Sequence, residues 1–154
     1  MKLVRESLLE QESNKENIEI SAGLAIIQDN TILLAHPKGS KWWGTYSIPK
    51  GHVEPGEDIL NAAIRETREE VGVTVTPQDI KDKKPKYVDY KDKRGRVYKR
   101  VYFFIVQPQE DMNFNIAVDK KEMDWAGFLT KAKAAQRINP RLKPILNVLK
   151  SEEE

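Results

Sequence analysis

The segment 51–73 constrains the fold more than any other part of the chain. It opens with Gly51, Pro55 and Gly56, residue types that favour tight turns and a close approach of the backbone to other groups. A helix is predicted to begin near Asp58, because an aspartate suits both the N-cap position and the helix dipole. Gly72 favours a left-handed cap and predicts the end of this helix.

The predicted helix has two unlike faces. An apolar stripe, expected to face the core, is spaced by four, three and four residues and comprises Leu60, Ile64, Thr67 and Val71. Glu66, Glu69 and Glu70 are predicted to lie together on the opposite face. Like charges four residues apart destabilise a helix, whereas a hard divalent cation stabilises clustered carboxylates. The alternative is a solvated face on which Arg65 and Arg68 offset the glutamates.

The composition limits which kinds of site are available. The chain has no cysteine and two histidines, so it cannot form disulfides and a histidine-based zinc site is not expected. A metal site would have to use oxygen ligands, which favour Mg²⁺, Mn²⁺ or Ca²⁺. The sequence contains no long apolar run and no signal-peptide pattern, so we expect a cytoplasmic protein without a membrane partner.

The length of 154 residues predicts a single domain, with residues 1–17 as a loose arm or an edge strand. Strands are predicted at residues 18–28, 31–35, 45–48, 73–76, 85–90, 96–107, 115–118 and 123–129. Helices are predicted at 58–71, 130–138 and 140–150. Asp29 and Asn30 predict a two-residue hairpin turn, and the apolar residues 101–106 predict a central strand. The fold class is therefore α+β.

The motif in 51–73 resembles the Nudix box of the Nudix hydrolase family. Every fixed position of that pattern is present: Gly51, Glu57, Arg65, Glu66, Glu69, Glu70 and Gly72. The one mild departure is Thr67, at a position where the family usually has an aliphatic residue. The resemblance extends to residues 47–52 and to the segment after Glu122, so it covers most of residues 18–150.

The resemblance implies an α/β/α sandwich around a mixed β-sheet. It also implies Mg²⁺-dependent hydrolysis, with Mn²⁺ as a possible substitute, of a pyrophosphate bond in a nucleoside diphosphate linked to another group. Glu69 and Glu70 would bind the metal, and Glu66 would be a further ligand or the base that activates water. The Lys50 carbonyl would be a backbone ligand. The residues that orient the glutamates would be Glu57 and Arg65.

One more carboxylate from outside the box is expected by the same resemblance. Glu122 is the first candidate, because it begins the segment that resembles a late strand of the family. Glu110 and Asp111 are the next candidates. The alternative for each is an ordinary surface acid.

The substrate-binding residues are predicted from loops outside the box. Three aromatic residues precede it and are expected to stack on a base: Trp42, Trp43 and Tyr46. Weaker candidates are Tyr87, Tyr90 and Tyr102. Lysines expected to contact phosphates are Lys38, Lys41 and Lys50. We interpret His36 and His52 as structural rather than catalytic.

The substrate class is less constrained than the chemistry. Residues 49–67 resemble dinucleoside tetraphosphate hydrolases, so dinucleoside polyphosphates are the first substrate candidates. Nucleoside triphosphates, including oxidised ones, are the next candidates, and ADP-ribose and capped or triphosphorylated RNA 5′ ends follow. The segment Lys81–Arg100 has ten Lys and Arg against three Asp, so RNA is a possible partner. The alternatives are a solvated basic hairpin and a nucleotide-binding protein without catalysis. The sequence does not predict an oligomeric state.

Overall fold

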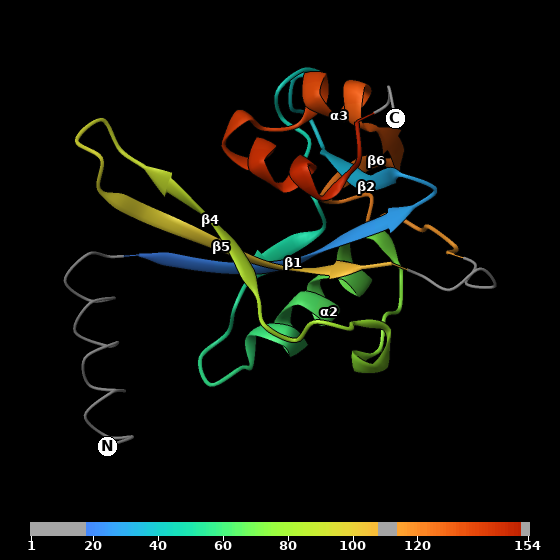
Figure 1. The fold of residues 1–154 in the computed structure, drawn as a ribbon, viewed down its shortest axis with the longest axis horizontal. Coiled ribbons are helices and arrows are strands. Elements are labelled where there is room, and N and C mark those ends of the chain that lie inside the picture. The colour runs from blue at the N-terminus through green and yellow to red at the C-terminus, as the bar shows by residue number, and fades with distance from the viewer. Residues whose placement is uncertain (1–17, 108–113, 152–154) are drawn as a thin grey trace.

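The computed structural model describes residues 18–107 and 114–151, and it places one mixed sheet between two helical layers (Figure 1). The strands are β1 (Glu19–Gln28), β2 (Thr31–Pro37), β3 (Lys50–His52), β4 (Lys86–Lys91), β5 (Val97–Val106) and β6 (Met123–Thr130). The helices are α2 (Ile59–Val71), η1 (Pro77–Asp79), α3 (Lys131–Arg137) and η2 (Pro140–Val148). The predicted arm 1–17 and the candidates Glu110 and Asp111 lie outside the described residues.

The sheet has the strand order β4-β5-β1-β2-β6, with β3 paired to β1. β1 runs parallel to β5 and antiparallel to β2 and β3, so the sheet is mixed. The prediction of β5 as a central strand is confirmed. The predicted hairpin turn is also confirmed, because Asp29 and Asn30 both have positive φ, as a two-residue turn between right-twisted strands requires.

Two apolar cores lie on opposite sides of the sheet. Ala22, Leu24 and Ile26 of β1 belong to the core with α2, whereas Ala25 and Ile27 belong to the core with α3 and η2. This alternation follows from the two-residue period of a strand. Figure 1 shows α2 below the sheet and the segments of α3 and η2 above it. The α/β/α sandwich implied by the resemblance is confirmed.

Helix α2 begins and ends where the sequence predicts. The Asp58 side chain accepts a hydrogen bond from the Asn61 amide, and Gly72 adopts the left-handed conformation with φ of 73°. Thr67 fits its apolar surroundings because its hydroxyl donates to the Ala63 carbonyl at 2.8 Å. The prediction that the three glutamates lie opposite the core is wrong for Glu70, which is buried like Thr67 and Val71 of the apolar stripe.

Four predicted elements differ from the structure. Residues 45–48 form no strand, because Tyr46 and Ser47 each make a single bridge to a different partner, Ile138 and Ala35. Residues 73–76 form no strand either, although Val73 and Val75 are buried in alternation as a strand pattern would place them.

Residues 115–118 are likewise not a strand, because they hydrogen-bond to the C-terminal end of α2 and not to another strand. The Ala117 amide donates to the Val71 carbonyl at 2.8 Å, and the Asp119 amide donates to the Glu70 carbonyl at 2.9 Å. The last predicted α-helix is a 3-10 helix, η2, with Pro144 inside it. Proline lacks an amide donor and clashes with an α-helical turn, which explains the tighter form. Among the described residues, no helix is long and apolar enough to cross a membrane.

Candidate functional site

The turn before α2 brings strand β3 against the helix. β3 pairs with the start of β1, where Gly51 lies opposite Ala22 and Lys50 lies opposite Gly23. A Cβ atom at Gly51 would lie 2.1 Å from the carboxyl carbon of Glu66, so only glycine leaves room for that carboxylate. Gly23 serves a similar purpose, because a Cβ there would lie 2.3 Å from the Pro49 carbonyl oxygen.

The three glutamates of α2 occupy three different environments. Glu70 is 7% exposed, and its side chain accepts a hydrogen bond from the Lys50 amide at 3.1 Å. The Glu66 side chain is 14% exposed, whereas the Glu69 side chain is 52% exposed. A uniform solvated face is therefore excluded for Glu66 and Glu70.

Burial raises the pKa of the Glu70 carboxyl to about 8, against the lowering effect of the Lys50 amide and ammonium groups. The nearby charges of Glu66 and Glu122 raise it further. Burial also raises the pKa of Glu66, to which Glu69 and Glu122 contribute. Glu66, Glu70 and Glu122 are thus close enough to repel one another, although they come from two separate parts of the chain.

Arg65 connects the loop to the glutamates through a network of hydrogen bonds. Its guanidinium donates to both carboxylate oxygens of Glu57, at 2.7 and 3.0 Å, and to the His52 carbonyl at 3.1 Å. It also donates to Glu66 at 3.0 Å and to Glu69 at 3.1 Å. The hydrogen bond from Arg65 lowers the pKa of Glu57 to about 2, and the same pairing raises the pKa of Arg65.

The side chains gathered here are of the type that binds a hard divalent cation, but their carboxylates are too far apart to hold one without moving. Glu66, Glu70 and Glu122 supply the carboxylate oxygens that Mg²⁺ prefers, and their mutual repulsion is what a bound cation relieves. Within residues 18–107 and 114–151, no three acidic or histidine side chains are already close enough to hold an ion. Glu69 is held by Arg65 instead, so metal binding would require its carboxylate to move away from that guanidinium.

Glu122 lies in the turn that leads into β6. Its amide donates to the Asp119 carbonyl at 3.0 Å, and its own carbonyl accepts from the Lys38 amide at 2.8 Å. These backbone bonds fix the turn while the side chain remains exposed. The charge of Glu122 contributes to the raised pKa of Glu66 and Glu70, so this side chain lies near the α2 glutamates. Its role as a metal ligand stays a prediction.

The aromatic residues predicted to stack on a base lie in different environments. Trp42 and Trp43 are 52% and 61% exposed. Tyr46 is fully buried, and its hydroxyl accepts a hydrogen bond from Arg137 at 3.0 Å. The prediction of base stacking is wrong for Tyr46, because its ring has no accessible face.

The lysines predicted to contact phosphates also lie in different environments. Lys38 and Lys41 are exposed in the loop that carries Trp42. Lys50 lies beside Lys99, and burial together with this second cation lowers the pKa of Lys50 to about 8. Lys99 belongs to β5 and was not predicted, because a strand position gives no sequence signal for contact with the turn.

The β4–β5 hairpin extends beyond the helical layers (Figure 1). Its Arg100 guanidinium lies 4.0 Å from the Tyr87 ring centroid and donates to Asp89 at 2.6 and 3.0 Å. Tyr87 is exposed, Tyr102 is half-buried and Tyr90 is buried. The hairpin therefore presents Tyr87 and several lysines to solvent, while Arg100 is already paired.

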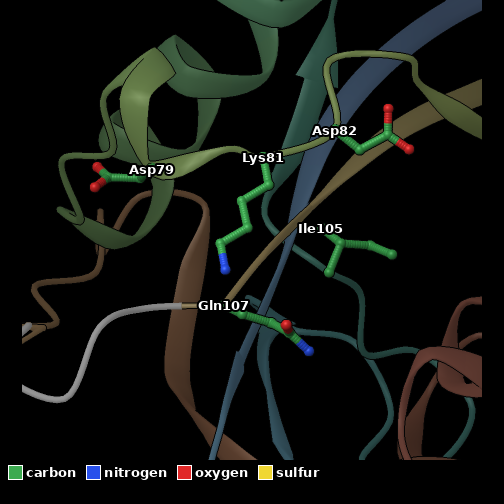
Figure 2. Close-up of a pocket in the computed structure, with 5 residues that line it drawn as sticks. All are labelled: Asp79, Lys81, Asp82, Ile105 and Gln107. Atoms are coloured by element: carbon green, nitrogen blue, oxygen red, sulfur yellow. The ribbon is translucent and has the colours of Figure 1, made fainter.

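A pocket of about 230 Å³ lies elsewhere on the sheet, between η1 and β5 (Figure 2). Its lining residues are Asp79, Lys81, Asp82, Ile105 and Gln107. Lys81 extends toward Gln107, while Asp79 and Asp82 point away on either side (Figure 2). None of the predicted catalytic, metal-binding or substrate-binding residues lines this pocket, although Lys81 and Asp82 begin the predicted basic segment Lys81–Arg100.

Two residues outside the predicted set contact the aromatic loop, by which we mean residues 36–45, from the end of β2 to the residue before Tyr46. Asp124 contacts the ring of His36, and the Arg137 guanidinium lies 5.2 Å from the Trp43 ring centroid. His36 is buried and His52 pairs with Glu19, in keeping with a structural interpretation of both histidines. The only sequence signal available for these contacts was the aromatic character of the loop.

Comparison with known proteins agrees with this architecture. A model of the NUDIX domain matches residues 18–149. The bis(5′-nucleosyl)-tetraphosphatase [asymmetrical] of Sus scrofa is 30% identical over 113 residues, which cover 70% of this chain and 74% of that protein. The RNA pyrophosphohydrolase of Campylobacter jejuni is 28% identical over 118 residues, or 71% of this chain and 74% of that protein.

Solved structures have the same fold. An Ap4A hydrolase binary complex from C. elegans has a TM-score of 0.63 at 25% identity and covers 84% of this chain and 93% of that chain. A bifunctional NMN adenylyltransferase/ADP ribose pyrophosphatase from Francisella tularensis, complexed with AMP and a manganese ion, has a TM-score of 0.69 at 17% identity. It covers 96% of this chain and 45% of that chain. The chain belongs to the Nudix family and is a pyrophosphohydrolase.

Proposed function

We propose that this protein hydrolyses a pyrophosphate bond of a dinucleoside polyphosphate in a Mg²⁺-dependent reaction. The observation that carries the proposal is the close approach of Glu66 to Gly51 and of Glu70 to the Lys50 amide, with Glu122 near enough to raise the pKa of both glutamates. Buried carboxylates that repel one another are costly unless a cation neutralises them. The arrangement is therefore better suited to function than to stability.

The residues that would hold the metal are Glu66, Glu69, Glu70, Glu122 and the Lys50 carbonyl. When bound there, Mg²⁺ would neutralise phosphate oxygens and lower the pKa of a coordinated water. Mn²⁺ has similar ligand preferences and is the expected substitute.

The protein side chains supply positioning and a proton acceptor. Glu66 is the proposed base: its carboxylate accepts a proton from water as the water oxygen forms a bond to phosphorus. The bond from phosphorus to the bridging oxygen breaks, and the leaving phosphate keeps the electron pair. Arg65 and Glu57 hold the Glu66 carboxylate in place, since Arg65 bonds to both at once.

The substrate proposal rests on similarity and on the exposed loop. The pig relative is a bis(5′-nucleosyl)-tetraphosphatase, and its alignment covers 70% of this chain. A dinucleoside polyphosphate has two bases and several phosphates. Trp42 and Trp43 offer exposed rings for a base, and Lys38 and Lys41 offer cations for phosphates.

A second candidate substrate is the triphosphorylated 5′ end of RNA. The basic segment Lys81–Arg100, which includes β4 and the start of β5, supports this substrate. Its exposed cations and the exposed ring of Tyr87 are suited to binding single-stranded RNA. The Campylobacter relative is an RNA pyrophosphohydrolase, which is consistent with this alternative.

The test is a hydrolysis screen with and without Mg²⁺. The substrates are diadenosine tetraphosphate, nucleoside triphosphates including oxidised ones, ADP-ribose and 5′-triphosphate RNA. We expect the highest kcat/KM for diadenosine tetraphosphate. Glu70→Gln should lower kcat by several powers of ten, on the order of 3–6 kcal/mol in activation free energy, because a ligand of the metal is lost.

Glu54→Gln is the matched control, since Glu54 is an exposed glutamate of the same turn. It should retain wild-type kcat. Near-normal Mg²⁺-dependent turnover by Glu70→Gln would refute the proposed site. Inactivity of the wild-type protein on every substrate would favour binding without catalysis.

A further inference from the structure

All three tryptophans of the chain are partly exposed, and two of them lie beside one buried ring. Trp42, Trp43 and Trp125 are 52%, 61% and 37% exposed, whereas Tyr46 is fully buried. The ring centroids of Trp42 and Trp125 lie 6.2 and 5.8 Å from that of Tyr46. A cluster of exposed aromatic side chains on a small protein is typical of a ligand-binding surface.

Trp42 differs from Trp43 in how it is held. The indole of Trp42 stacks on the imidazole of His36, with ring centroids 4.0 Å apart and an interplanar angle of 4°. His36 is 1% exposed, and both of its ring nitrogens are engaged. Nε2 donates to the Lys41 carbonyl at 2.9 Å, and Nδ1 contacts the carboxylate of Asp124. One face of Trp42 is therefore covered by a ring that cannot easily rotate.

Trp43 has no comparable support. Its ring lies 5.2 Å from the guanidinium carbon of Arg137, which also contacts Tyr46 and donates to the tyrosine hydroxyl. A cation–π contact at an exposed site is weak. Trp43 is consequently the less restrained of the two neighbouring indoles.

The support of Trp42 is connected to the carboxylates through the start of β6. Asp124 belongs to β6, and Glu122 lies two residues before it in the preceding turn. The Lys38 amide donates to the Glu122 carbonyl at 2.8 Å, which ties the aromatic loop to the same turn. The charge of Glu122 in turn raises the pKa of Glu66 and Glu70. The turn before β6 and the first residues of that strand thus position both the Trp42 indole, through Asp124 and His36, and Glu122, a candidate metal ligand.

We propose that His36 and Asp124 are positioning residues that hold Trp42 as a stacking platform for one base of the nucleotide substrate. The inference rests on the proposed function and adds a specific residue for base recognition. Stacking on His36 leaves Trp42 with a single free face, which matches the single planar surface of a nucleobase. Lys38 and Lys41 precede this indole in the same loop and are exposed, so their cations would complement the phosphates of the same nucleotide.

The experiment measures binding and turnover separately in the full chain. Equilibrium dialysis with AMP reports base binding without hydrolysis, and steady-state kinetics with diadenosine tetraphosphate separates KM from kcat. Trp42→Leu should raise both the AMP dissociation constant and KM by about tenfold, since base–aromatic stacking has that magnitude. It should leave kcat nearly unchanged. Trp43→Leu, at the less restrained indole, should raise both constants by less than Trp42→Leu does. Tyr98→Leu removes an exposed ring of β5 instead, and as the matched control it should change each constant by less than about twofold.

Asp124→Ala tests the positioning role at a partly exposed residue, where folding is least at risk. It should raise KM about threefold in the wild-type background and not at all in the Trp42→Leu background, because coupled residues are non-additive. Asp124→Glu should restore part of the affinity.

Equal effects of the two tryptophan substitutions, additive effects of Asp124→Ala and Trp42→Leu, or no AMP binding by the wild-type protein would each overturn the inference. If the wild-type protein bound AMP but hydrolysed no substrate, the proposed function would fail, and the dissociation constants would still decide the role of Trp42.

Discussion

The Gly51 turn with helix α2 and the aromatic loop with Trp42 are built in opposite ways. In the first region, hydrogen-bond partners are close in sequence: Glu57 and Arg65 are 8 residues apart, and Lys50 and Glu70 are 20 apart. In the loop they are distant, since His36 and Asp124 are 88 residues apart. The hydrogen bonds that hold the turn against the helix are thus local, whereas those of the loop involve the C-terminal third of the chain, which also supplies Glu122 to the first region.

The two regions also differ in exposure. The turn encloses carboxylates that would be more stable in water, and the loop exposes indoles that would be more stable in a core. Each region therefore departs from ordinary folding preferences, and such departures are typical of functional sites. We infer that the carboxylates determine the rate of the chemical step and that the loop determines which substrate is held. Substitutions in the first region should change kcat, and those in the second should change KM.

Gly51→Ala should have the largest effect among changes that remove no charged group. Its new methyl group would lie 2.1 Å from the Glu66 carboxylate, so that carboxylate must move. We expect kcat to fall by roughly a hundredfold or more, as expected when a reacting group is displaced by about 1 Å. Steady-state kinetics at saturating Mg²⁺ and substrate is the measurement.

Gly56→Ala is the comparison for this prediction. Gly56 has a φ of 77° and no atom within 4 Å of its Cβ position. The substitution should cost about 1–2 kcal/mol of folding free energy through backbone strain and should leave kcat largely intact. A fall in kcat of the same size in both variants would show that the turn matters only for folding.

The stability of the metal-free protein should depend on pH through Glu70. Its pKa is raised to about 8, so the fold favours the protonated carboxyl. This contribution is fully present below the unfolded pKa of about 4.5 and is lost as the pH rises to about 8. The free energy of unfolding in EDTA should therefore decrease from pH 5 to pH 8, on the order of 2–4 kcal/mol. Denaturant titrations at each pH measure it.

Glu66 has a raised pKa and acts in the same direction, whereas the lowered pKa of Lys50 adds stability only as the pH rises above about 8. Glu57 has a pKa of about 2 and stays ionised throughout this range. Glu70→Gln should flatten the pH dependence, and Mg²⁺ should restore stability to the wild-type protein at pH 8. An identical slope in wild type and variant would contradict the assignment to Glu70.

The smallest expected effect concerns the basic hairpin. Lys93→Glu combined with Arg94→Glu reverses two exposed charges at its tip. We expect kcat/KM for 5′-triphosphate RNA to fall about threefold to tenfold at low salt, and kcat/KM for diadenosine tetraphosphate to change little. As a control, Lys133→Glu with Lys143→Glu reverses the charge of two exposed lysines in the helical layer formed by α3 and η2. Equal losses in both pairs would indicate a general charge effect without RNA recognition.

The parts that the sequence predicted correctly depend on local spacing. The cap at Asp58, the end at Gly72 and the pairing of Glu57 with Arg65 all arise within one helix and its entry turn. The hairpin turn at Asp29 and Asn30 is likewise local. Such features follow from residue type and spacing, because the interacting groups are neighbours in the chain.

The predictions that were wrong concern residues whose burial or secondary structure depends on contacts with segments distant in the sequence. The burial of Glu70 depends on the packing of α2 against β1 as well as β3, and the helix pattern alone does not show which strands cover the helix. Tyr46 is buried because it packs in a core with Ala134 and Ile138, which come from α3 and the residue that follows it. The segments 73–76 and 115–118 have strand-like composition, but their partners are the end of α2 and the core and not another strand. Tertiary contacts of this kind have no signature in a single sequence.

The most direct test of the account is isothermal titration calorimetry of Mg²⁺ binding to wild-type protein and Glu70→Gln. If Glu66, Glu70 and Glu122 share one cation, binding near pH 7 should release about one proton, because the Glu70 carboxyl with its pKa of about 8 must ionise. The heat should then vary with the ionisation enthalpy of the buffer. Glu70→Gln should abolish this variation and weaken binding by at least about tenfold. Equal affinity and equal proton release in the two proteins would contradict the account.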